Sequence, residues 1–83
     1  MTTKKTYYPA QGLTSIYDGS IAYTKMLMVA REGVLYDIIT TNNDILLNTR
    51  QVRYSPGLAE LSFNADIPFN LNESINIVYE TNP

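Results

Sequence analysis

The chain lacks both cysteine and histidine in all of its 83 residues. Without cysteine there is no disulfide framework, no thiolate nucleophile and no zinc–thiolate site. Without histidine the chain lacks the commonest general base and the commonest ligand of transition metals, which excludes serine–histidine, cysteine–histidine and histidine–metal chemistry. We therefore expect a protein that is not an enzyme, with no catalytic residues, no metal and no cofactor.

Positive charge and long apolar segments are also scarce. Six Lys and Arg against eight Asp and Glu give a formal net charge of −2, whereas nucleic-acid binding depends on neutralising phosphates with basic side chains. The longest apolar run, "MLMVA", is far too short to span a bilayer, and no apolar stretch of signal-peptide length follows "MTTKK". We expect a soluble protein with neither a nucleic-acid nor a membrane partner.

The chain does contain short runs of β-branched and aromatic residues separated by turn residues, and no segment sustains an apolar period of three or four residues. Asp18-Gly19 predicts a two-residue hairpin, and Glu32-Gly33 and Pro56-Gly57 predict further turns. Asn42-Asn43-Asp44 predicts a loop, because Asn and Asp bond their own backbone. About seven short strands at this spacing predict an all-β fold, a small single-domain antiparallel β-sandwich.

Alternation with a period of two residues indicates which side chains form the core. Pro68 cannot donate to a β-ladder, so its segment is expected at an edge or at a crossing between sheets. A chain of about this size buries only roughly 60% of its unfolded surface, so a partner would add stability. The predicted core residues are Tyr36, Leu61, Phe63, Ile75, Ile77 and Tyr79.

The opening segment, "TTKKTYYPAQG", is polar and does not alternate. We predict that residues 1–11 form an extended N-terminal arm and that residues 12–83 form the β-sandwich domain. Tyr7 and Tyr8, with Leu13, have no assigned place in the core, and aromatic side chains on an arm are disfavoured unless something covers them. We therefore expect the arm to contact a partner, and edge strands to offer a second means of attachment.

The candidate contact residues come from this arm and from one predicted strand. Arg50 and Arg53 are interpreted as a charged strand flank, with an inter-subunit salt bridge as the alternative. The predicted partner contacts are Lys4, Lys5, Tyr7, Tyr8, Arg50 and Arg53.

The acids and the tyrosines allow other interpretations. Two acids facing one cleft would suit a carboxylate-only glycan hydrolase, and the candidate acids are Asp18, Asp37, Asp44, Asp66 and Glu73. All of these except Asp37 fall in predicted turns, where they serve the local backbone. Seven tyrosines could form a carbohydrate platform or a stacking surface. Three of them lie in phase with core positions: Tyr36, Tyr54 and Tyr79.

Three segments in this order, "REGVLYDI", "QVRYSPGLAELSF" and "IPFNLNESINIVYE", resemble the small β-sandwich modules of tailed-bacteriophage virion proteins. Those modules begin with a polar-Gly turn that is followed by a hydrophobic residue and a Tyr. A second Tyr then precedes a turn and a strand with the pattern apolar-x-Phe. The modules end with Pro-Phe and the pattern acid-x-Ile-x-Val-x-Tyr. The resemblance spans roughly residues 29–80, and the chain departs from it in its longer middle segment "TTNNDILLNTRQ" and in standing outside a long fibre. The matching residues are Gly33, Val34, Tyr36, Tyr54, Leu61, Phe63, Pro68, Phe69, Glu73, Ile75, Ile77 and Tyr79.

The resemblance implies a structural role in a virion that is assembled in the host cytoplasm. It favours a capsid auxiliary or decoration protein that binds the major capsid lattice or adjoining fibres and stabilises the particle. The implied partners are other virion proteins, such as the major capsid protein or a fibre protein, together with self-association. A tail, neck or fibre adaptor module and a host-surface carbohydrate-binding module are the alternatives.

Overall fold

The computed structural model describes residues 1–40 and 48–81, and it confirms the all-β prediction. Two short 3-10 turns, η1 (Gly19–Ile21) and η2 (Pro56–Leu58), accompany the strands. The strands in the described residues are β1 (Thr2–Tyr7), β2 (Ser15–Tyr17), β3 (Lys25–Arg31), β4 (Val34–Ile39), β5 (Gln51–Ser55), β6 (Glu60–Phe63) and β7 (Ile75–Glu80).

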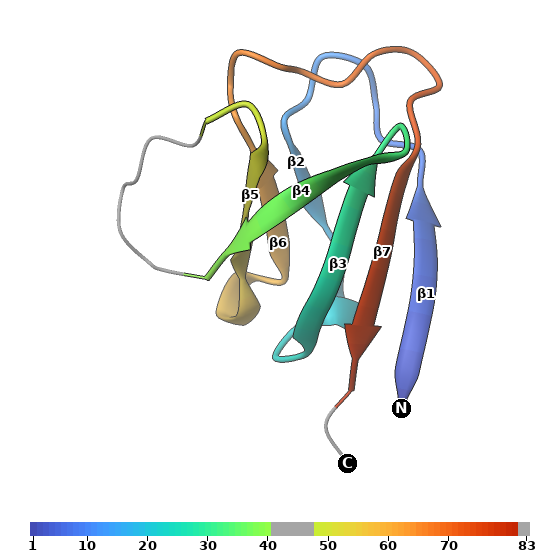
Figure 1. The fold of residues 1–83 in the computed structure, drawn as a ribbon, viewed down its shortest axis with the longest axis vertical. Coiled ribbons are helices and arrows are strands. Elements are labelled where there is room, and N and C mark those ends of the chain that lie inside the picture. Colours follow the sequence, from blue (N-terminus) through green and yellow to red (C-terminus); the bar gives the residue numbers. More distant parts are fainter. Residues whose placement is uncertain (41–47, 82–83) are drawn as a thin grey trace.

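The strands form one curled sheet in the order β1-β7-β3-β4-β5-β6-β2 (Figure 1). The sheet is mixed rather than purely antiparallel, because β4 and β5 run parallel. The structure does not confirm a sandwich. The first half of β4 pairs with β3, at Val34 to Tyr36, and its second half pairs with β5, at Asp37 to Ile39. This strand therefore carries the sheet continuously round the bend where a sandwich would divide into two layers.

The core lies inside the curl, and it contains five of the six residues predicted from the alternation as buried side chains: Leu61, Phe63, Ile75, Ile77 and Tyr79. The sixth, Tyr36, is half-buried and packs edge-on against Phe63 with ring centroids 5.4 Å apart. Phe69 also packs edge-on against Phe63, with ring centroids 5.4 Å apart. Pro68 and Phe69 lie in the connection between β6 and β7, outside any strand.

Two of the predicted turns are confirmed and one is wrong. Glu32 and Gly33 have positive φ angles of 51° and 79°, as a tight hairpin between β3 and β4 requires. Pro56-Gly57 turns the chain between β5 and β6. Asp18-Gly19 forms no hairpin: the Asp18 side chain caps η1 instead, and β2 pairs with the distant β6. The predicted loop at Asn42-Asn43-Asp44 lies outside the described residues.

The prediction of an N-terminal arm outside the domain is also wrong. Residues 2–7 form β1, which pairs antiparallel with β7 from Thr2 opposite Glu80 to Tyr7 opposite Ile75. Alternate residues of β1 are half-buried, but only Tyr7 among them is apolar, so the pattern resembles a solvated segment. The domain therefore begins at β1 rather than at residue 12.

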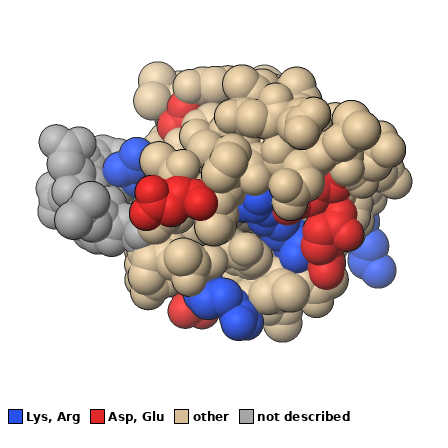
Figure 2. Space-filling model, turned by 90° about the horizontal axis from the view of Figure 1, so that it is seen from above, with Lys and Arg blue, Asp and Glu red and all other residues tan. Residues whose placement is uncertain are grey.

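Basic and acidic side chains are interspersed on the face of the molecule that Figure 2 shows. Neither sign of charge gathers into a continuous patch on that face.

Candidate partner-binding seam

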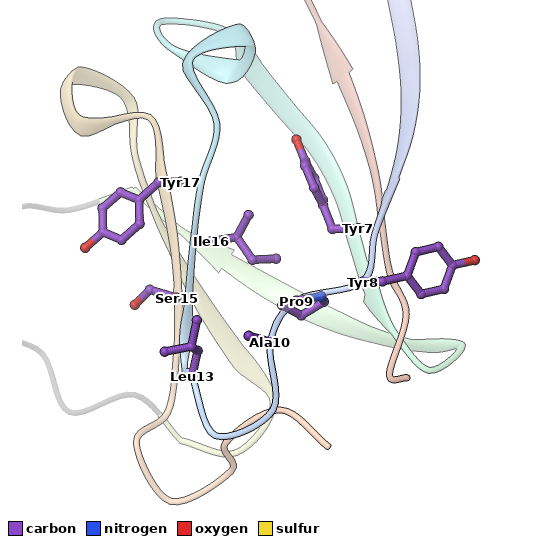
Figure 3. Close-up of a pocket in the computed structure, with 8 residues that line it drawn as sticks. All are labelled: Tyr7, Tyr8, Pro9, Ala10, Leu13, Ser15, Ile16 and Tyr17. Atoms are coloured by element: carbon purple, nitrogen blue, oxygen red, sulfur yellow. The ribbon is translucent and has the colours of Figure 1, made fainter. Parts of the chain in front are cut away.

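The sheet ends at two strands, β1 and β2, and each of them pairs with a single neighbour among the described residues, β7 and β6 respectively. Because the sheet curls, these two edges come round toward each other (Figure 3). We call the space between residues 2–10 on the β1 side and residues 13–17 on the β2 side the seam. A β-strand edge carries unpaired backbone donors and acceptors, so both sides of the seam can accept another strand.

The seam contains an open pocket of about 280 Å³, with more apolar than polar lining: Tyr7, Tyr8, Pro9, Ala10, Leu13, Ser15, Ile16 and Tyr17. The side chains of Tyr7 and Ile16 point toward each other across it, whereas the rings of Tyr8 and Tyr17 point outward on either side (Figure 3). Tyr8 is 72% exposed, Tyr17 70% and Leu13 53%. Large apolar side chains therefore flank an apolar pocket on the surface.

Side-chain bonds, rather than backbone bonds, join the two edges near η1. The Tyr7 hydroxyl donates to Asp18 Oδ2 at 2.5 Å, and Lys5 Nζ donates to the same oxygen at 2.9 Å. Lys5 also donates to the Ser20 hydroxyl, and the Ser20 backbone N–H donates to Asp18 Oδ1 at 3.0 Å. A single carboxylate thus connects β1 with the segment that follows β2.

These contacts shift the pKa of each group that takes part. The Tyr7 hydroxyl and Lys5 hold the pKa of Asp18 well below its usual range, because both donate to the ionised carboxylate. Burial, and then the bond to Asp18, raises the pKa of Tyr7 above its usual value. The bond to Asp18 also raises the pKa of Lys5. At neutral pH the cluster is an ion pair with a neutral tyrosine.

Backbone hydrogen bonds hold the other end of the seam. Phe69 N–H donates to the Leu13 carbonyl at 2.8 Å, and Gly12 N–H donates to the Phe69 carbonyl at 2.9 Å. Phe63 N–H donates to the Thr14 carbonyl at 2.8 Å. These bonds attach residues 12–14, which lie between the two sides of the seam in the sequence, to β6 and to the β6–β7 connection.

The predicted contact residues fall on two separate surfaces. Lys4 and Lys5 lie on β1, with Tyr7 at its end and Tyr8 directly after it, so the β1 side of the seam carries this group. Arg53 lies within β5 and Arg50 directly before it, where Arg50 donates to the Leu35 carbonyl at 3.5 Å. Tyr7 differs from the prediction because its ring packs against the core.

Sequence reasoning missed the β2 side of the seam. Leu13 has no assigned place in the predicted core, and Ile16 and Tyr17 precede Asp18-Gly19 in the predicted hairpin, which does not form. No local pattern indicates that these residues face β1, because that contact depends on how far the sheet curls.

A second polar cluster lies between β3 and the β6–β7 connection. Arg31 and Glu73 are each only 5% exposed and form a two-point ion pair, in which Arg31 Nε and Nη2 donate to the two carboxylate oxygens. The guanidinium also donates to the Pro68 carbonyl at 2.9 Å and lies 4.9 Å from the Phe69 ring centroid and 5.3 Å from that of Phe63. Arg31 lowers the pKa of Glu73 by donating to its ionised form. This cluster fastens the β6–β7 connection to the sheet.

Within residues 1–40 and 48–81, no group of three or more acidic side chains gathers where it could hold a metal ion, and no helix is long and apolar enough to cross a membrane. No protein-family model, curated protein or solved structure matches the chain.

Proposed function

We propose that this chain is a non-enzymatic structural protein that acts by binding another protein at the seam. Following the resemblance to phage virion modules, we place it in a virion as a capsid auxiliary or decoration protein whose partners are other virion proteins. The observation that carries the proposal is that the two edge strands, β1 and β2, each have one edge without a neighbouring strand among the described residues and lie across an apolar pocket from each other.

The surface beside this pocket supports a binding role. Exposed apolar patches with polar surroundings are typical of interaction sites, and the exposed side chains of Tyr8, Leu13 and Tyr17 lie around one pocket. Open sheet edges are typical sites of strand addition by a partner. A protein that coats a lattice in many copies needs only modest affinity for each copy, which a small contact of this kind can supply.

The two acids with shifted pKa values do not favour a carboxylate-only hydrolase. Such an enzyme needs one carboxyl whose pKa is raised, so that it is protonated when it donates to the leaving group. The pKa values of Asp18 and Glu73 are both lowered, and both carboxylates accept hydrogen bonds from basic side chains. In the proposal both acids serve the fold: Asp18 connects β1 with the segment after β2, and Glu73 connects the β6–β7 connection with β3.

A carbohydrate-binding role on a host surface is the second candidate, and the exposed Tyr8 and Tyr17 favour it. Their rings point to opposite sides of the pocket, however, whereas a sugar platform needs aromatic faces in one patch. A glycan array with the full chain separates the two candidates. Glycan binding that is lost in Tyr17→Ala would favour this second role.

The experiment that tests the proposed function is to express the tagged chain in the cells that naturally make it and to isolate particles by sedimentation. Quantitative mass spectrometry should find the chain in the particle fraction in fixed proportion to the major capsid protein. A chain that stays entirely in the unassembled fraction would refute the virion role.

A further inference from the structure

The geometry points to a specific kind of partner segment at the seam: an extended strand that pairs with β1, carries an acidic side chain opposite Lys4, and inserts an apolar side chain into the pocket. This inference rests on the proposed function and deepens it, because it names the chemistry of the binding partner.

The partner strand pairs with the free edge of β1. All of β1 from Thr2 to Tyr7 pairs with β7 on one side, and on its other side the described residues provide no strand. The bonds from Lys5 and Tyr7 to Asp18 hold this edge in place without occupying its backbone. A preformed edge lowers the conformational entropy that binding must remove.

The alternation along β1 determines what the partner strand must present on each face. Lys4 is exposed and points outward, whereas Tyr7 is half-buried and lines the pocket. Side chains on an added strand alternate in the same way, so the residue opposite Lys4 stays in solvent and the residue opposite Tyr7 enters the pocket. On the partner strand, the residues opposite Lys4 and Tyr7 are three positions apart, and this odd separation places their side chains on opposite faces of the sheet.

Charge favours an acidic partner. The Lys4 side chain has neither an ion pair nor a hydrogen bond within the part of the chain that the structure describes, whereas the side chain of its neighbour Lys5 is bonded to Asp18. Opposite charges on facing residues of neighbouring strands stabilise the pair, and like charges destabilise it. An acidic residue opposite Lys4 would complete a cross-strand ion pair on the exposed face.

The same charges disfavour a second copy of this chain as the occupant. Two copies of β1 that paired antiparallel about a two-fold axis through its centre would place the lysines of one copy against those of the other. Lysine on an exposed edge is a common device against such pairing. The occupant is therefore a segment of another protein.

The probes for the test are two short, capped peptides in which valine alternates with threonine around a central phenylalanine. One peptide carries glutamate three positions from the phenylalanine, and the other carries lysine there. Each is titrated into the isotope-labelled full chain and followed by NMR. The glutamate peptide should shift the amide signals of residues 2–7 and 13–17, and it should bind about five- to tenfold more tightly than the lysine peptide.

Charge reversal at Lys4 provides the decisive variant. In Lys4→Glu the preference should reverse, so that the lysine peptide binds more tightly. The matched control is Arg50→Glu, which makes the same charge change away from the seam and should leave the preference unaltered. Ala10→Phe, which fills the pocket, should weaken both peptides while the thermal unfolding midpoint stays close to that of the parent chain.

Any of three results with the peptides would overturn the inference: no shift with either peptide, equal affinity for the two peptides, or shifts confined to residues outside the seam. Self-association of the chain in competition with the peptides would show that a second copy is the occupant, which also overturns it. These failures are distinguishable from failure of the proposed function, because a chain that is found in particles but ignores both peptides uses another surface. If the chain binds the glutamate peptide but is never found in particles, the strand-binding site is supported and the virion role is refuted.

Discussion

Asp18 shows how one side chain can hold together segments that are far apart in the sequence. It accepts bonds from Lys5 and Tyr7 on β1 while it caps η1 through Ser20. The predicted local backbone role of Asp18 is confirmed, because its side chain caps η1, although the predicted hairpin at Asp18-Gly19 is wrong. The two partners from β1 have no signal in the sequence, because the polar residues 2–7 do not indicate a strand.

Replacing Asp18 with asparagine should lower the free energy of unfolding by about 1–2 kcal/mol, because bonds to an ionised acceptor are lost at a site partly open to solvent. Urea denaturation near neutral pH measures this. Asp66→Asn is the control, since Asp66 is an exposed turn acid without an ion pair among the described residues. Equal stability of the two variants would contradict the role of Asp18.

Acidic pH should lower the free energy of unfolding, because folding lowers the pKa values of both Asp18 and Glu73. A carboxyl of this kind contributes its full stability above its unfolded pKa, about 4, and loses that contribution as the pH falls through the folded pKa. The stability difference between the parent chain and Asp18→Asn should therefore narrow as the pH falls below about 4. Urea denaturation along a pH series measures it, and a constant difference would count against the assignment.

Glu73→Gln should be severely destabilising, by about 3–5 kcal/mol, because it leaves the buried Arg31 guanidinium without its counter-charge. The double variant Arg31→Met with Glu73→Leu should recover much of that loss, since it removes both charges together. Thermal unfolding of the three chains compares them. If the double variant is as unstable as Glu73→Gln, the ion pair is not the cause of the loss.

At the scale of elements, the predictions that succeeded depend on local chemistry. The Glu32-Gly33 hairpin follows from residues that tolerate positive φ, and the buried faces of β6 and β7 follow from alternation at Leu61, Phe63, Ile75 and Ile77. The predictions that failed concern pairing between distant strands. β1 pairs with β7 at the opposite end of the chain, and a threonine- and lysine-rich strand gives no local sign of that partner.

Deleting residues 1–7 tests whether β1 is part of the domain. The deletion exposes the edge of β7 and removes Tyr7 from the core, so we expect a chain that is largely unfolded by circular dichroism and NMR. Thr2→Ser is a mild control that keeps the strand. Cooperative unfolding of the truncated chain at an unchanged midpoint would show that the segment is a passive tail.

At the scale of the whole molecule, the all-β class could be predicted from the sequence, but the curl of the sheet could not. The curl follows from β4, which pairs with β3 at one end and with β5 at the other, and it brings β1 and β2 together. Half of the candidate site was anticipated through Lys4, Lys5, Tyr7 and Tyr8. The other half, on the β2 side, depends on this closure.

The central claim is that the seam, and not another exposed surface, contacts the partner. Tyr17 on the β2 side of the seam and Leu35 on β4 are suitable positions for testing it, because both are well exposed, at 70% and 60%, and β4 lies three strands away from each edge of the sheet. Each is replaced in turn with a photo-crosslinking amino acid, and the full chain is irradiated in isolated particles and analysed by mass spectrometry. The account predicts a crosslink from position 17 to an extended, acidic segment of another virion protein, and none from position 35. A crosslink from position 35 alone would contradict it.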